Sequence, residues 1–250
     1  MGHRGSSQNM VLNKKGFLFT GIAILLLSLF LASYTFYEDV QERKSVQKRI
    51  ETMNNFLFSI EKDLERQLYV AGFRSIFIME NEIIETGSYV NNINVRTEEL
   101  FFNGTYNNNY QEIMEGATFN DIQNSINLKS EKISSFINLS DAKISISQSD
   151  PWNVKFSLNL SLLFQDSSGL AFWNKTLIIV SYVPVAGFKD PIYTVNTNDL
   201  VLNNISKSPF DKFAEGADVS NLSEHSNNMH YISHSDAPSF IDRLEGNLVA

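Results

Sequence analysis

Several residue types on which protein chemistry depends are scarce in this chain. It has no Cys among its 250 residues, which excludes a disulfide framework, a thiolate metal site and a Cys nucleophile. Its net charge is −8 and no block of basic residues occurs, so nucleic acid is not an expected partner. The sequence contains no Gly-rich phosphate loop, G-x-S-x-G elbow or H-E-x-x-H pair. We therefore expect neither an enzyme nor a cofactor, and a fold stabilised by packing alone.

Charge is absent from one long stretch, Phe17–Tyr37, which reads FLFTGIAILLLSLFLASYTFY. As a helix this stretch spans roughly 30 Å, the thickness of a bilayer core. Lys14-Lys15 precedes it and Glu38-Asp39 follows it, so the positive-inside rule places residues 1–16 in the cytoplasm and the rest outside. A secretory signal peptide is the alternative, but its apolar region usually runs about 7–15 residues. Leu31-Ala32-Ser33 offers only a mediocre cleavage site.

Proline is absent between Glu38 and Glu85, where Gly72 is the only glycine. The opposite charges on this stretch fall three or four apart on one helical face. We expect one helix from about Gly16 to Glu85, roughly 100 Å long, whose outer half packs against the rest of the chain. A parallel coiled-coil dimer is the alternative, although the heptad spacing is lost near Leu68. The apolar residues expected to form the packing stripe recur in steps of three and four up to Ala71 and continue after a step of five: Val46, Ile50, Met53, Leu57, Ile60, Leu64, Leu68, Ala71, Ile76, Met79 and Ile83.

The remaining residues, 88–250, predict an α+β head domain. Residues 88–117 suggest a loop with a turn of helix near Glu98–Phe102, and Thr118 or Asn120 can cap a helix to about Asn138. Apolar and polar residues then alternate, which predicts an antiparallel sheet at about 143–195. The expected strands cover 143–149, 154–164, 170–183 and 192–195, with short structure at 209–213 and 237–244.

The predicted fold class is therefore α+β, with a long N-terminal transmembrane and amphipathic helix packed by an antiparallel β-sheet. Its expected parts are a cytoplasmic leader (1–16), a transmembrane helix (17–37), an extracellular continuation of that helix (38–87) and an extracellular head domain (88–250).

A basic leader ending in Lys14-Lys15-Gly16 stands directly before this apolar helix. In that arrangement the chain resembles the archaeal type IV pilin-like proteins. The resemblance implies that a prepilin-type peptidase cuts between Gly16 and Phe17. It also implies that the apolar helix anchors the subunit in the lipid bilayer and later packs with other pilin-like subunits. Gly21 stands at the fifth place of the mature chain, where bacterial pilins usually carry Glu and archaeal relatives commonly do not.

Two further segments look similar to segments of archaeal membrane-anchored proteins. The first is Asp190–Thr197, which reads DPIYTVNT and follows the predicted sheet. The second is Asp236–Gly246, which reads DAPSFIDRLEG.

Sequons for N-glycosylation are frequent, and all lie beyond residue 100, on the predicted outer side. Because Asn, Ser and Thr are abundant there, composition alone accounts for some of them. We expect at least one to carry a glycan, and Asn159 and Asn174 fall at outward positions of predicted strands. The candidates are Asn103, Asn138, Asn159, Asn174, Asn204 and Asn221.

One cluster contains residue types that bind metals. His225, His230 and His234, with Asp236, are ligand types that suit Zn²⁺ or Ni²⁺. The surrounding sequence is polar and has no clear element to fix their geometry. We interpret them as exposed loop side chains and expect no metal.

Carboxylate pairs and aromatic residues also have simple interpretations. Asp39 with Glu42, and Glu80 with Glu82, fall on the predicted solvated face of the long helix. Trp152 and Trp173 could together form a carbohydrate-binding surface. Packing within the sheet is the favoured interpretation for the strand aromatics, which are Trp152, Phe156, Phe164, Trp173 and Tyr182.

These observations favour a structural cell-surface protein, a minor or atypical pilin-like subunit that crosses the cell membrane once and contributes to a surface filament. The alternative is a single-pass membrane-anchored binding or receptor module that stays in the membrane, and an exported enzyme ranks third. The first two differ in whether the chain is cut after Gly16.

Overall fold

The computed structural model describes residues 14–214, 216–234 and 236–249. The chain divides into two compact units, Met1–Asn54 and Asn55–Ala250. Helix α1 (Lys14–Thr86) contributes residues to both. The helix predicted over Gly16–Glu85 is thus confirmed, whereas most of the predicted leader lies outside the described residues.

The apolar stripe of α1 forms part of the hydrophobic core of the second unit. From Leu57 onward the stripe is buried by other residues of the same chain. The predicted packing role is therefore confirmed there, and a second helix in a coiled coil is not needed to cover it. Gly87, at φ 63°, then ends the helix, and its N–H donates to the Ile83 carbonyl at 2.8 Å. The buried stripe residues are Leu57, Ile60, Leu64, Leu68, Ala71, Ile76, Met79 and Ile83.

Two helices follow α1, and both differ from their predictions. Helix α2 (Ile93–Asn103) is longer than the expected turn at 98–102, and the small hairpin β1 (Thr105–Tyr106) and β2 (Asn109–Tyr110) follows it. A 3₁₀ turn, η1, covers Glu112–Met114. Helix α3 (Phe119–Glu131) begins with the predicted Thr118 cap, completed by Asp121 in a capping box.

The predicted extension of α3 to Asn138 is wrong. Ser134 has a positive φ of 50°, which breaks the helix, and strand β3 begins at Ser135. The phenylalanine and isoleucine after it therefore continue a sheet and not a helical face.

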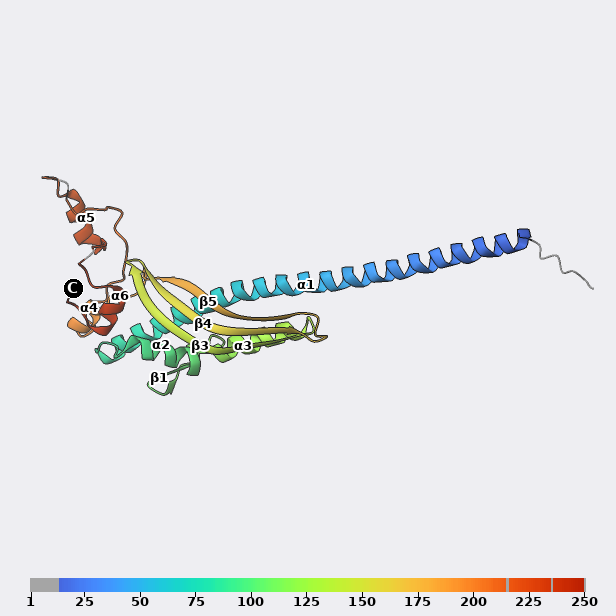
Figure 1. Cartoon of the computed structure of the whole chain (residues 1–250). Helices are drawn as coiled ribbons and strands as arrows, with labels where there is room; N and C mark the ends of the chain where they lie inside the picture. The colour runs from blue at the N-terminus through green and yellow to red at the C-terminus, as the bar shows by residue number, and fades with distance from the viewer. Residues whose placement is uncertain (1–13, 215, 235, 250) are drawn as a thin grey trace, which may run out of the picture. The chain divides into compact units, whose positions relative to one another are not determined.

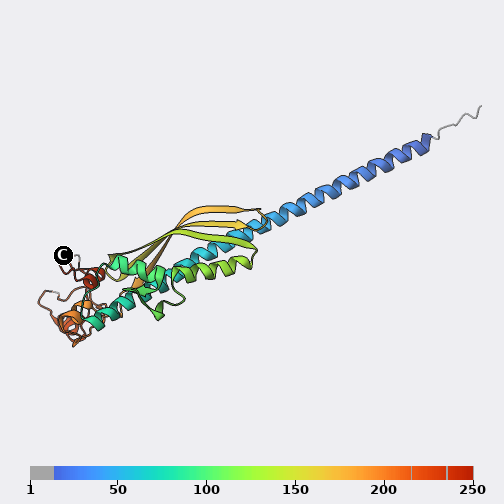
Figure 2. The same ribbon diagram turned by 90° about the horizontal axis from the view of Figure 1, so that it is seen from below.

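The sheet contains strands β3 (Ser135–Asp150), β4 (Asn153–Asp166) and β5 (Phe172–Pro184), antiparallel in the order β3-β4-β5 (Figure 1). It covers 135–184, against the predicted 143–195. The ribbon views show one face of this sheet lying over α2, α3 and the second-unit part of α1 (Figures 1 and 2). That face carries the alternating residues predicted for β4, all buried: Val154, Phe156, Leu158, Leu160, Leu162 and Phe164.

One close approach joins α1 to the centre of this sheet. Gly72 is buried beneath Phe156, and a Cβ added to Gly72 would lie 2.7–2.9 Å from three carbons of that ring. Ion pairs frame the same interface, with Lys129 of α3 at 2.5 Å from Asp63 and Lys175 of β5 paired with Glu61. The lone glycine of the outer helix is thus required by packing.

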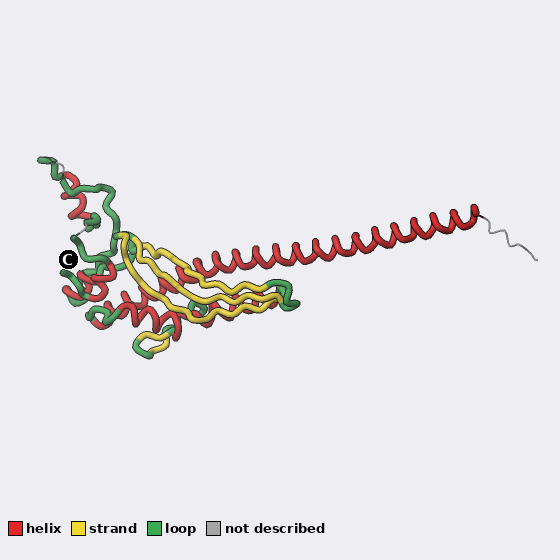
Figure 3. The backbone as a smooth tube through the Cα atoms, viewed as in Figure 1, coloured by secondary structure: helices red, strands yellow, loops and turns green. Residues whose placement is uncertain are grey.

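The segment after the sheet contains three short helices, α4 (Pro191–Asn196), α5 (Ser220–Asn228) and α6 (Phe240–Glu245) (Figure 3). The predicted strand at 192–195 is wrong. Asp190 caps α4 by accepting from the Ile192 N–H at 3.1 Å, and Pro191 occupies the first helical position. Helix α6 confirms the structure expected at 237–244, whereas 209–213 forms neither helix nor strand.

Candidate functional site

The apolar segment of α1 is the first candidate site. Between Lys14 and Thr86 one helix is long and apolar enough to cross a membrane, and the residues of Phe17–Tyr37 are exposed. Phe17, at the predicted cleavage junction, has 78% of its surface exposed. A helix of this composition exposed to water is unfavourable, so a lipid or protein surface is needed to cover it.

Three hydroxyl groups of this segment donate within the helix itself. Thr20, Ser28 and Thr35 donate to backbone carbonyls three or four residues earlier, at 2.5, 2.8 and 2.9 Å. These three hydroxyls therefore need no partner from the surroundings, which suits a hydrocarbon environment.

The segments Asp190–Thr197 and Asp236–Gly246 meet in the second unit. Asp190, which is 2% exposed, accepts from Arg243 Nη1 and from the Tyr231 hydroxyl, each at 2.8 Å. Burial, followed by the Asp190 charge and hydrogen bond, raises the pKa of Tyr231, so that its hydroxyl remains a donor. Phe188 and Phe240 stack beside this group, with ring centroids 6.0 Å apart. We call Asp190, Tyr231 and Arg243 the Asp190 clamp.

Helix α6 is also fixed to the start of α2. The Leu244 carbonyl accepts from the Val90 N–H at 2.8 Å, and Glu245 Oε1 accepts from the Ile93 N–H at the same distance. The carboxylate therefore satisfies a free amide in the first turn of α2. The Asp190 clamp and these bonds show that Asp236–Gly246 has a structural role, which is to hold α6 against α4 and α2.

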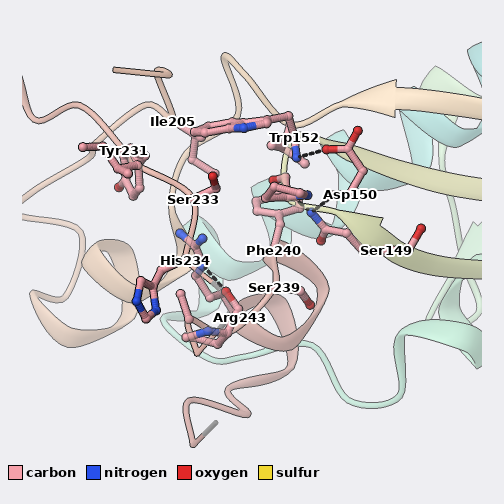
Figure 4. Close-up of a pocket in the computed structure, with 16 residues that line it drawn as sticks. Ser149, Asp150, Trp152, Ile205, Tyr231, Ser233, His234, Ser239, Phe240 and Arg243 are labelled. Atoms are coloured by element: carbon pink, nitrogen blue, oxygen red, sulfur yellow. Dashed lines mark hydrogen bonds between the residues drawn. The ribbon is translucent and has the colours of Figure 1, made fainter. Parts of the chain in front are cut away.

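A cavity of about 380 Å³ lies between the β3–β4 turn and α6 (Figure 4). Trp152 lies on one side of it and Arg243 on the other. Asp150 fixes the turn by accepting from the Trp152 N–H at 2.7 Å and from Asn153 Nδ2 at 2.9 Å. These hydrogen bonds, the larger effect on this carboxyl, lower the pKa of Asp150. Gln148 ties the turn to α6 by accepting from the Ile241 N–H at 3.2 Å.

Trp152 and Trp173 do not share a surface, so a joint carbohydrate site is wrong. Trp152 precedes β4, whereas Trp173 pairs with Phe164 near the other end of that strand and stacks on it at 5.4 Å. Asn153, next to Trp152, and Phe164, the partner of Trp173, are eleven residues apart on β4, or about 36 Å at the usual rise per residue. Of the strand aromatics, Phe156 and Phe164 are buried as expected, but Tyr182 is exposed on the outer face.

The histidine cluster divides between two places. His225 and His230 line a smaller cavity of about 190 Å³ with Phe213 and Met229. His234 lines the larger cavity, and its Nδ1 accepts from the Asp236 N–H at 3.2 Å. Within the described residues no group of three His, Asp or Glu side chains could hold a metal ion.

Glu80 is the carboxylate that sequence reasoning misplaced. It is 6% exposed, not solvated, and Oε1 accepts from the Lys189 N–H at 2.6 Å. Burial raises the pKa of Glu80, and the bond from Lys189 opposes that shift only in part. The available signal was its spacing, four residues after Ile76 and three before Ile83, which places Glu80 beside the buried stripe.

Three of the six sequons lie on the solvent-facing side of the sheet. Asn138, Asn159 and Asn174 lie on β3, β4 and β5, and all three are exposed. In the register of the sheet Leu163 pairs with Asn138 on one side and Asn174 on the other. Asn103 and Asn204 are also exposed, whereas Asn221 is half-buried. Glycosylation at these positions stays a prediction.

No protein-family model, curated protein or solved structure matches this chain.

Proposed function

We propose that this chain is a structural subunit of the cell surface, anchored in the membrane by α1 and assembling with other pilin-like subunits through it. In this proposal residues before Phe17 lie in the cytoplasm and the α+β unit lies outside. A prepilin-type peptidase cuts after Gly16, and the lipid bilayer and neighbouring subunits cover the apolar segment in turn.

One observation supports this function above the others. A single helix, α1, combines the uncharged exposed segment Phe17–Tyr37 with a stripe that is buried in the core of an antiparallel-sheet domain. An ordinary membrane anchor requires only the first part. A helix that serves both as anchor and as domain core suits a subunit whose head is positioned by helix packing.

The N-terminus of the mature protein tests this proposal. We expect intact mass and N-terminal sequencing of the protein from native membranes to show a chain that begins at Phe17. A matched pair of variants, Gly16→Leu and Gly21→Leu, alters one glycine at the junction and one beyond it. Only Gly16→Leu is expected to retain the leader. A wild-type chain that keeps Met1 or Gly2 would contradict processing.

The second candidate is a membrane-anchored binding module that never leaves the bilayer, and the cavity beside Trp152 favours it. Shearing cells and collecting surface filaments separates the two. Recovery of the cleaved chain in filaments supports the subunit proposal. A chain found only in the membrane fraction, uncut at Gly16, supports the module.

A further inference from the structure

The cavity beside Trp152 has features that limit the kind of ligand it can take. Its lining combines one indole ring with serine, amide, carboxylate and guanidinium groups. The residues that carry this mixture are Gln148, Asp150, Trp152, Ser233, Ser239 and Arg243. Its volume, about 380 Å³, is near the low end for sites of small molecules.

Charge argues against an anionic ligand such as a phosphate. The basic side chains of the lining are Arg243 and His234, and the Arg243 guanidinium is already paired with Asp190 at 2.8 Å and donates from Nε to the Pro238 carbonyl at 3.2 Å. The N-terminus of α6 is occupied by its own capping box, in which Ser239 and Asp242 satisfy each other's backbone N–H groups. An added anion would also face the exposed Asp150 carboxylate.

An entirely apolar ligand fits no better, because hydroxyl and carboxylate groups line the same walls as Trp152 and would lose water without a replacement partner. A neutral ligand with one apolar face and many hydroxyls satisfies both kinds of wall. Sugar rings have this character, with C–H groups on a face that stacks on an indole and hydroxyls around the edge.

The indole is held ready for such stacking. Asp150 fixes the Trp152 backbone, and the Lys207 ammonium, which does not line the cavity, lies 5.6 Å from the ring centroid. Figure 4 shows the ring with a flat side toward Phe240 and Arg243. Because Gln148 also bonds the β3–β4 turn to α6, little ordering remains to be done when a ligand enters.

We propose that this cavity is a carbohydrate-binding site for neutral sugars, with Trp152 as the stacking surface. The proposal goes beyond the structural role of α1, because it uses no residue of the apolar segment and applies equally to an assembled or a solitary subunit. Binding by the head and assembly by the helix are therefore tested separately.

The chain contains only two tryptophans, which makes fluorescence a direct test. In the full-length protein carrying Trp173→Phe, Trp152 is the sole indole. We titrate this variant in detergent with neutral gluco-, manno- and chito-oligosaccharides up to millimolar concentration. We expect a saturable change in emission with at least one of them, and the complementary variant, Trp152→Phe, should show no change in Trp173 emission.

Two substitutions test the cavity by calorimetry against the sugar that binds. Trp152→Ala is expected to weaken binding by about tenfold or more, since it removes the stacking surface. Ala237→Tyr keeps Trp152 and blocks the exposed rim of the cavity with a bulky ring, so it should also abolish binding even if Trp152→Ala folds poorly. Ser145→Tyr, exposed on the outer sheet face, is the matched control and should bind as wild type.

Three results would overturn the proposal. The first is no saturable change with any neutral sugar. The second is unchanged affinity in both Trp152→Ala and Ala237→Tyr. The third is binding of inorganic phosphate or acidic sugars alone. None of these outcomes alters the N-terminal sequencing result, so a failed sugar site and a failed pilin-like role remain distinguishable.

Discussion

Replacing Gly72 by Ala sets two physical effects against each other. Gly72 is in the interior of α1, where alanine favours the helix over glycine by about 1 kcal/mol. From helix propensity alone, Gly72→Ala should stabilise the protein. The structure predicts the opposite sign, because the added Cβ would lie 2.7–2.9 Å from the Phe156 ring.

The size of the effect follows from this overlap. Carbon atoms prefer separations of about 3.5–4.0 Å, so the new methyl is short of contact distance by about 0.6–1.3 Å. Phe156 is fully buried and cannot turn away without disturbing its neighbours. Overpacking costs about 1–3 kcal/mol, and a fully buried ring puts this overlap in the upper part of that range, about 2–3 kcal/mol, from which the helix gain of about 1 kcal/mol is subtracted. We expect a net loss of about 1–2 kcal/mol in the free energy of unfolding, or about 3–6 °C in Tm.

Urea and thermal unfolding of the full chain in detergent measure this loss. Gly21→Ala is the matched control, because a Cβ at Gly21 meets nothing within 4 Å and should not lower the Tm of the head. Phe156→Leu should relieve the overlap, so the double variant should lose less stability than the two single losses added together. A neutral or stabilising Gly72→Ala, or additive losses, would refute the packing argument.

Three other predictions concern the second unit. Asp190→Ala leaves the half-buried Arg243 charge without its carboxylate and should cost about 3 kcal/mol, seen as faster amide exchange in α4 and α6, whereas the exposed Asp211→Ala should cost little. Burial raises the pKa of Glu80 above its ordinary 4.5, so folding favours the protonated side chain. The stabilisation from this protonation is complete below pH 4.5 and is lost as the pH rises through the raised pKa. Glu80→Gln keeps an acceptor for the Lys189 N–H, so its stability relative to wild type should increase from acid to neutral pH in urea unfolding; a difference independent of pH contradicts this. For protein made in the native host, changing an occupied Asn to Gln should lower the intact mass by the mass of one glycan. The same glycan mass in every variant would exclude the three exposed sites on the sheet, which are Asn138, Asn159 and Asn174.

Regular periodicity made much of the fold predictable. The stripe from Leu57 to Ile83 and the alternation in β4 both belong to elements with one buried face. The spacing of apolar residues in the sequence is enough to predict such a face. The helix cap at Thr118 and the end of α1 at Gly87 were likewise local signals. Local sequence was sufficient to predict these elements, and long-range packing did not change them.

The errors arise where a short element depends on distant partners. Ile192–Val195 has strand-like composition, but Asp190 caps it as a helix while its other carboxylate oxygen binds Arg243, fifty-three residues away. Burial of Glu80 likewise depends on the backbone of Lys189, 109 residues later. The cavity was missed for the same reason, because Trp152 and α6 meet only in the folded domain.

The bonds from α6 to α2 also determine when the head can be completed. Glu245 and Ile93 are 152 positions apart, and the residues between them include the whole sheet. During synthesis or export, α2 can pack on the sheet and α3 before α6 exists, but the Ile93 N–H lacks its carboxylate partner until Glu245 has emerged. The sheet and α1 can therefore form early, and the contacts that join α6 to α2 are among the last of this domain to form. A chain that stops before Leu244 would keep the sheet and α1 but leave the Val90 and Ile93 N–H groups without these two acceptors.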